Sequence, residues 1–164
     1  MGKKYILTPE KAMMSLRRMA FEILERNNGA TAVSIAGIRE NGYVVAQELK
    51  TILAEISTLQ IDLIEILIDK SNPIDCSIPD SIDLKDKILI VVDDVVNSGK
   101  TLLYAILPFL QFSPKQIQTL TLVERSYKIF PVHVDYVGIS LATTLQENIS
   151  VEVVEAKLAG AYVV

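Results

Sequence analysis

Apolar runs alternate with amphipathic stretches along most of this chain. Five consecutive apolar residues, mostly β-branched, occupy positions 88–92 and are bounded by polar residues. Such a run is typical of a strand that is buried on both faces. Apolar segments at 31–35, 61–68 and 117–123 predict three further strands.

Helical periodicity appears between these strands. Thr8 as the N-cap and Pro9 at the first helical position predict a helix with an apolar stripe to about residue 25, which Asn27-Asn28-Gly29 ends. A second helix is expected after Gly42, carrying Val44, Val45, Leu49, Ile52 and Leu53. Strands that alternate with helices favour an α/β fold, a single domain with a mostly parallel twisted sheet flanked by helices.

The rest of the chain is less regular. Residues 132–138 alternate between apolar and polar, which predicts a strand near a sheet edge. Two closing strands are expected at 149–154 and 162–164, with Gly160 as the turn between them. Residues 69–86 are polar, contain two prolines and show no periodicity, so we expect a lid or a mobile loop there. No internal repeat or linker interrupts the chain.

Composition narrows the classes of protein that remain. Half of the residues are hydrophobic and the mean hydropathy is +0.34, which favours a buried interface in a homodimer or higher homo-oligomer. A net charge of −4 excludes a global attraction to nucleic acid, although a local basic patch is still compatible with it. No apolar run reaches the length of a membrane span. The single cysteine, Cys76, fits a reducing compartment, so we expect a cytoplasmic protein; with one histidine, His133, a Cys/His zinc cluster is not available.

The most informative stretch follows the apolar run at 88–92. Two carboxylates, Asp93 and Asp94, come directly after it, and a short glycine-containing loop occupies 97–101. Ligands bind at the carboxyl ends of strands in an open parallel sheet, and the first N–H groups of a following helix suit a phosphate. The helix is expected from the spacing of Leu102, Leu103, Ile106, Leu107 and Leu110.

Three interpretations of this stretch compete. A P-loop requires glycine five positions before Gly99, where this chain has Asp94, and a charged side chain there conflicts with a bare backbone cradle. Alternatively, the acids are a surface pair that caps a helix, with Gly99 in an ordinary turn. The third interpretation is a functional site at the end of the strand, in which the loop and the start of the helix bind a phosphate. We favour it because strand, acids, turn and helix agree.

This stretch resembles the motif of the type I phosphoribosyltransferases, in which two acids and a Thr/Ser-Gly-Lys/Arg-Thr/Ser loop follow a hydrophobic strand. The resemblance covers nearly all of residues 1–164 and implies a single domain of that fold with a small hood. In the family the two acids, here Asp93 and Asp94, hold the ribose hydroxyls of phosphoribosyl pyrophosphate (PRPP) and are the catalytic pair, while the loop backbone cradles the 5-phosphate. The resemblance assigns PRPP binding to Asp93, Asp94, Val95, Asn97, Ser98, Gly99, Lys100 and Thr101.

A second glycine loop resembles the pyrophosphate loop of the PyrR-like branch of this family, which reads Gly-Ile-Lys/Arg-Thr-Arg-Gly. Glu40 and Asn41 replace the Thr and the second Arg of that pattern, so a carboxylate stands beside the expected pyrophosphate and one guanidinium is missing. A tight strand-to-helix turn without a ligand is the alternative. The implied loop consists of Gly37, Ile38, Arg39, Glu40, Asn41 and Gly42.

The resemblance to the family is weakest in the residues that would contact the nitrogen base. Asp135-Tyr136-Val137-Gly138 is similar to a PyrR segment that leads into the hood over the base, which implies that Val137, Gly138 and Ile139 belong to the base hood. Ile139 replaces a family Lys and cannot hydrogen-bond a ring carbonyl. Asn97 stands where purine enzymes of the family have an Asp that handles the base proton, and an amide cannot take that proton.

The resemblance implies PRPP and a nitrogen base, a pyrimidine such as uracil, as substrates. It implies Mg²⁺ bound mainly through PRPP, and no metal-ligating residue of the chain is assigned. The departures at residues 40, 41, 97 and 139 keep a second function open, that of a PRPP- or nucleotide-sensing regulator without turnover. The PyrR-like branch also implies RNA as a partner, to which Arg17 and Arg18 would contribute across a dimer.

Overall fold

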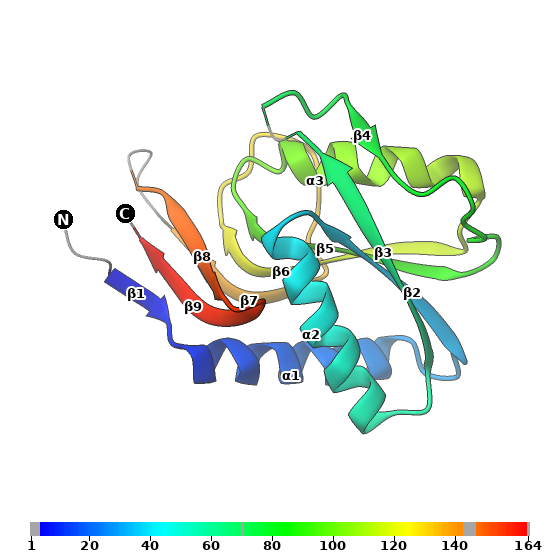
Figure 1. Ribbon diagram of the computed structural model, residues 1–164, viewed down its shortest axis with the longest axis horizontal. Helices are drawn as coiled ribbons and strands as arrows, with labels where there is room; N and C mark the ends of the chain where they lie inside the picture. The colour runs from blue at the N-terminus through cyan, green and yellow to red at the C-terminus, as the bar shows by residue number, and fades with distance from the viewer. Residues whose placement is uncertain (1–3, 70, 143–146, 164) are drawn as a thin grey trace.

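The computed structural model describes residues 4–69, 71–142 and 147–163. A six-stranded sheet forms the body of the molecule, and a three-stranded antiparallel sheet lies at one end, near both chain termini (Figure 1). This architecture confirms the predicted α/β class and the small hood.

The main sheet has the strand order β4-β3-β2-β5-β6-β7. All neighbours are parallel except β3 and β4, which pair antiparallel. The predicted central strand is confirmed because all but one residue of β5 are buried. The strands are β2 (Ala32–Ile38), β3 (Gln60–Ile68), β4 (Cys76–Ser77), β5 (Ile88–Val96), β6 (Gln116–Arg125) and β7 (Tyr136–Leu141).

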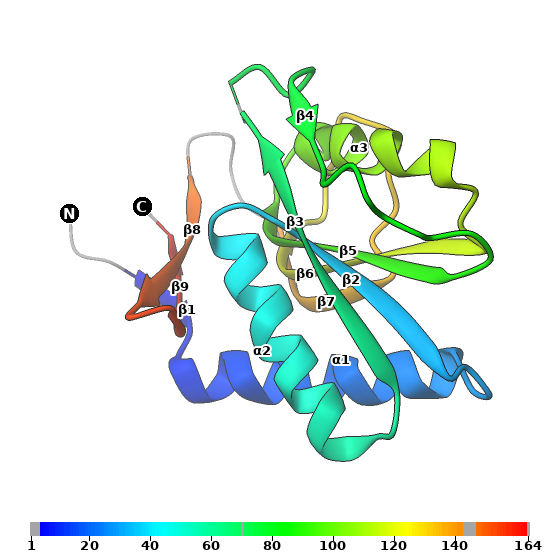
Figure 2. The ribbon, with the colours of Figure 1, turned by 45° about the vertical axis from the view of Figure 1, so that its right-hand side comes forward.

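Helices cover both faces of this sheet, as Figures 1 and 2 show. On one face, α1 (Pro9–Arg26) and α2 (Asn41–Ile56) pack on β2, β5 and β7, and on the other face lies α3 (Lys100–Ile106), continued by the 3-10 helix η1 (Leu107–Phe112). Each face therefore has its own apolar core, one around Leu16, Leu49 and Ile90 and one around Leu89 and Phe109. In the described part of the chain, no helix combines the length and apolar character that crossing a membrane requires.

The start of α1 was predicted correctly from sequence, but the end of α3 was not. Thr8 accepts a hydrogen bond from the Lys11 backbone N–H at 3.3 Å and Pro9 opens α1, as predicted. The helix after the acidic pair is shorter than its apolar spacing predicts. It ends as an α-helix at Ile106, two residues before Pro108, because proline lacks the N–H that the helix needs. Leu107 and Leu110 are consequently about half exposed instead of buried.

Several strand limits also differ from the prediction. The segment predicted as a strand at 132–138 begins only at Tyr136 and continues to Leu141, although its place at the sheet edge is confirmed. Residues 69–86, predicted as a loop, include β4, which pairs with the end of β3.

The small sheet consists of β1 (Lys4–Leu7), β9 (Lys157–Val163) and β8 (Ile149–Val154), in that order. The prediction of Gly160 as the closing turn is wrong. The turn is Glu155-Ala156, and Gly160 lies inside β9, where a Cβ would stand 2.5 Å from the Leu7 carbonyl oxygen. The predicted last strand residue, 164, falls outside the described residues.

Candidate active site

The acidic pair lies inside the end of β5 instead of after it. Asp93 is 2% exposed and Asp94 6% exposed, and the Asp94 backbone N–H donates to Asp93 Oδ1 at 2.9 Å. Carboxyl groups are rarely buried unless other groups compensate for the lost water. This burial contradicts the alternative of a surface pair that caps a helix, since α3 begins at Lys100 with Gly99 as its N-cap.

The turn after β5 encloses a small cavity next to Asp93. Gly99 adopts a left-handed conformation with φ of 84°, and a Cβ there would stand 2.6 Å from Val132 Cγ1. Asp94 lies beside Asn41 on another side, and the Lys100 side chain is exposed. The cavity has a volume of about 80 Å³ and is lined by Asp93, Val95, Val96, Asn97, Ser98, Gly99, Thr101 and Leu102.

A segment that the sequence analysis did not connect with the site holds this turn in place. The backbone N–H groups of Ile129 and Phe130, in the β6–β7 connection, both donate to the Ser98 carbonyl oxygen at 3.0 Å. Ser98 Oγ accepts from the Lys100 backbone N–H at 3.3 Å. No local signal marks this contact, because the connection follows the turn by about 30 residues of chain.

The predicted pyrophosphate loop is a shorter turn than expected. Gly37 and Ile38 belong to β2, and Asn41 and Gly42 already belong to α2. Only residues 39–40 connect the two elements, through a cis peptide bond.

Gly42 brings this turn against the acidic pair. A Cβ at Gly42 would lie 3.0 Å from the Val92 carbonyl oxygen and 3.1 Å from Asp93 Cα, which is closer than most side-chain carbons approach backbone. The two stretches that the sequence analysis singled out therefore meet at one place, although about 50 residues separate them in the chain.

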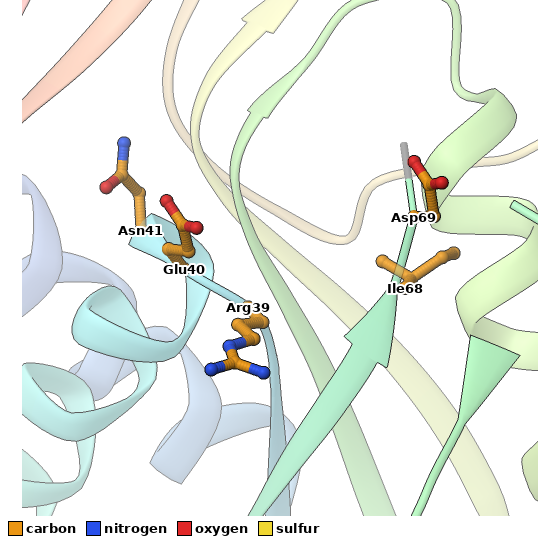
Figure 3. A pocket seen from close by; sticks show the side chains of 5 residues that line it. All are labelled: Arg39, Glu40, Asn41, Ile68 and Asp69. Carbon is orange, nitrogen blue, oxygen red and sulfur yellow. The ribbon is translucent and has the colours of Figure 1, made fainter. Parts of the chain in front are cut away.

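A second cavity, of about 310 Å³, opens between this turn and the end of β3 and is lined by Arg39, Glu40, Asn41, Ile68 and Asp69. Figure 3 shows Glu40 and Asn41 at the start of α2 on one side, with Ile68 and Asp69 on the other. The Arg39 guanidinium lies 3.7 Å from the Glu65 carboxylate, so it is shared with β3.

Two carboxylates border this second cavity. Hydrogen bonds from the Ser71 hydroxyl and backbone N–H hold the pKa of Asp69 below its ordinary value. Asp69 is consequently ionised at neutral pH and adds negative charge to that of Glu40. An anionic ligand such as pyrophosphate would therefore need cations of its own in this cavity.

The residues assigned to the base hood lie elsewhere than the small sheet. Val137, Gly138 and Ile139 are part of β7, the edge strand of the main sheet. Gly138 permits close approach to β6, because a Cβ there would collide with the Leu122 carbonyl oxygen. These residues therefore lie in the main sheet, and their assignment to the base hood stays a prediction.

Arg18 hydrogen-bonds to the backbone of this edge strand. Its Nη2 donates to the carbonyl oxygens of Val137 and Gly138 at 2.9 and 2.8 Å, and its Nη1 pairs with Glu22 at 2.6 Å. Arg17 lies 3.8 Å from Glu55. Both guanidinium groups predicted for an RNA surface thus have partners within the chain.

The carboxylate oxygens at the site suit a hard cation such as Mg²⁺ that binds together with a phosphate ligand. Among the residues that the structure describes, no three His, Cys, Asp or Glu side chains are grouped so as to hold a metal ion. Carboxylates of Asp93, Glu40 and Asp69 border the two cavities, and Mg²⁺ prefers such oxygen ligands while keeping several waters. These residues fit Mg²⁺ held chiefly by phosphate oxygens.

Comparison with known proteins gives a consistent result. A family model described as the phosphoribosyl transferase domain matches residues 4–156. The bifunctional protein PyrR of Clostridium kluyveri is 33% identical over 173 residues, covering 94% of this chain and 93% of the relative. That of Clostridium acetobutylicum is 34% identical over 164 residues, covering 93% and 92%.

Solved structures support the fold. The hypoxanthine phosphoribosyltransferase of Trypanosoma cruzi superposes with a TM-score of 0.75 at 15% identity, over 85% of this chain and 82% of that one. A hypoxanthine-guanine phosphoribosyltransferase of Bacillus anthracis reaches a TM-score of 0.71 at 18% identity, over 86% and 84%. With the family match across most of its length and relatives above 30% identity, this chain belongs to the type I phosphoribosyltransferase family.

Proposed function

We propose that the protein transfers a phosphoribosyl group from PRPP, with Mg²⁺, to a nitrogen base, a pyrimidine such as uracil. The observation that carries the proposal is the buried Asp93-Asp94 pair, which meets a glycine turn on one side and the start of α2 on the other. A carboxylate pair accepts hydrogen bonds from a ribose diol, whereas the backbone N–H groups of a turn donate to phosphate.

In this proposal each part of the site has one task. Asp93 and Asp94 orient the ribose, and the turn at 97–101 holds the 5-phosphate through backbone N–H groups and the Ser98 and Thr101 hydroxyls. The bond from C1 to the pyrophosphate oxygen breaks as the bond from C1 to the base nitrogen forms, along an oxocarbenium-like path, and the base nitrogen releases its proton to water. Arg39 faces the leaving pyrophosphate, and bound Mg²⁺ would neutralise charge on its oxygens.

Support for a pyrimidine comes from sequence. The relatives above 30% identity are named PyrR, and residues 135–138 resemble the PyrR segment that precedes the base hood. Asn97 also argues against the purine enzymes of the family, since its amide cannot accept the proton that their Asp takes.

Calorimetry of PRPP with Mg²⁺ tests the ribose assignment. The double variant Asp93→Asn/Asp94→Asn is expected to abolish the binding heat, because each amide replaces a charged acceptor of the diol. Asp62→Asn/Asp80→Asn, which removes the same charge from exposed positions, is the matched control and should bind as the wild type does. An unchanged affinity in the first variant would remove the assignment.

A second function, binding without turnover, is favoured by the acidic second cavity. With Glu40, Asn41 and the ionised Asp69 around it, the cavity has Arg39 as its one cation among the lining residues that the structure describes. A panel of bases incubated with PRPP and Mg²⁺ separates the two functions. We expect pyrophosphate release with uracil, and binding of PRPP without release for any base would establish a PRPP- or nucleotide-sensing regulator instead.

Three further proposals concern partners and location. A homodimer is supported by Met14 and Phe21, which expose 71% and 52% of their surface on α1. Sedimentation of the protein tests it.

RNA binding rests on the PyrR resemblance and is tested by filter binding at varied salt. A shallow dependence of the affinity on salt would count against it. A cytoplasmic location is proposed from the single thiol of Cys76.

A further inference from the structure

Asn41 joins three parts of the molecule that are far apart in sequence. It is the first residue of α2, and its side-chain Nδ2 lies 3.1 Å from Asp94 Oδ2 and 3.0 Å from the Val151 carbonyl oxygen. Asp94 lies near the end of β5, the central strand of the main sheet, and Val151 belongs to β8 of the small sheet. Figure 3 shows the Asn41 side chain at the tip of α2, directed away from Arg39.

The chemistry of the two acceptors fixes the orientation of this amide. Asp94 Oδ2 and the Val151 carbonyl oxygen both accept from the Asn41 side chain, so its NH₂ group faces them and its two N–H bonds serve one acceptor each. Asp94 and Val151 are each 6% exposed, so water competes little for either bond. A hydrogen bond to a charged group in such surroundings is stronger than an exposed one.

The rest of the contact between the small sheet and the body is largely apolar. Ile149, Val151 and Leu158 of the small sheet join the core formed with α1 and α2. Apolar packing is not directional and permits sliding, whereas the Asn41 amide sets a defined distance between β8 and the acidic pair.

We propose that Asn41 is a positioning residue, which holds the Asp94 carboxylate in place for ribose and ties the small sheet to it. The statement about ribose rests on the proposed function, whereas the tie to the small sheet does not. The residue that replaces a guanidinium of the family pattern thus has a different task here, because a short amide reaches both acceptors from the start of α2.

Two variants test the proposal against a matched control. Asn41→Asp keeps the shape but sets a carboxylate against two acceptors, and Asn41→Ala removes both bonds without adding charge. Gln47→Glu makes the same amide-to-carboxylate change at an exposed position of α2. Each protein is titrated with ribose 5-phosphate and, separately, with inorganic phosphate by NMR, and amide hydrogen exchange is measured along β8.

We expect both Asn41 variants to bind ribose 5-phosphate at least about tenfold more weakly. The response of the turn at 97–101 to inorganic phosphate should stay unchanged, since that turn does not contain Asn41. A variant that is only destabilised would lose affinity for both ligands to the same extent. Amides of β8 should exchange at least about tenfold faster in both variants and unchanged in Gln47→Glu.

Two results would count against the proposal. Wild-type exchange along β8 in both Asn41 variants overturns the tie to the small sheet. Wild-type affinity for ribose 5-phosphate in these variants overturns the positioning of Asp94. If the wild-type protein itself binds neither PRPP nor ribose 5-phosphate, the proposed function fails, and the exchange measurement still decides the tie.

Discussion

Single glycines decide how closely the backbone elements approach one another at this site. Gly42 lets the start of α2 approach the acidic pair, and Gly37 lets β2 approach the same helix, since a Cβ there would lie 2.7 Å from Tyr43 Cα. Gly99 combines a left-handed backbone with a position against Val132. Any larger residue at these positions would move an element of the site, so their effect is on binding as well as on stability.

Gly99→Ala is expected to weaken ribose 5-phosphate binding at least about tenfold, because relieving a contact of 2.6 Å with Val132 displaces the turn. Gly29→Ala is the matched control. Gly29 has nearly the same φ, 86°, and a Cβ there meets no atom within 4 Å, so both variants carry the cost of a left-handed alanine, about 1–2 kcal/mol. NMR titration should show normal binding for Gly29→Ala, and equal binding by both variants would contradict this account.

At the scale of elements, a buried polar network joins the end of α1 to two strands. Asn27 Nδ2 donates to the Ile23 carbonyl oxygen at 2.9 Å and to Gln118 Oε1 on β6 at 3.0 Å, and Gln118 Nε2 donates back to Asn27 Oδ1 at 2.8 Å. Tyr136 on β7 donates its hydroxyl to Gln118 Oε1 at 2.8 Å. Burial raises the pKa of Tyr136, which keeps this donor protonated.

Asn27→Ala should lower the free energy of unfolding by about 1–3 kcal/mol, since it leaves polar atoms of Gln118 buried with fewer partners. Asn28→Ala, at the exposed neighbouring position, should change the free energy by less than about 0.5 kcal/mol. Urea denaturation followed by circular dichroism measures both. If the two variants have the same midpoint, the network contributes nothing to stability.

At the scale of the whole molecule, the central sheet is shielded by two cores while the small sheet is shielded on one side. Residues 88–92 are at most 8% exposed between these cores. By contrast, Tyr5 and Val154 of the small sheet expose 48% and 54% of their surface. The small sheet therefore has less apolar contact to lose when it opens.

Native-state hydrogen exchange should follow this difference. We expect amides of β5 and β6 to exchange only through global unfolding, and those of β8 to exchange faster through local opening of the small sheet. The dependence of each rate on low urea concentrations distinguishes the two routes. Amides of β8 that exchange as slowly as those of β5 would show that the two sheets open together.

Much of the fold and half of the site could be predicted from sequence because their signals are local. The apolar run at 88–92, the Thr8-Pro9 start and the acid-turn-helix order each occupy a few consecutive residues. Where two local signals conflicted, the prediction was wrong. The apolar spacing after Gly99 predicted a helix through Leu110, whereas Pro108 ends the α-helix at Ile106. A motif indicates a segment but not the exact strand that it forms, so only the structure shows that residues 137–139 lie within β7.

The α/β class, the central buried strand and the nature of the groups at its end could be predicted from local patterns alone. Which distant segments complete the site became known only from the packing of the whole chain. The tie from Asn41 to Val151 spans 110 residues, and the Ser98 carbonyl oxygen is held by a connection from another strand. Local backbone preferences and periodicity determine single elements, whereas contacts between elements depend on how all of them pack, which no short stretch of sequence encodes.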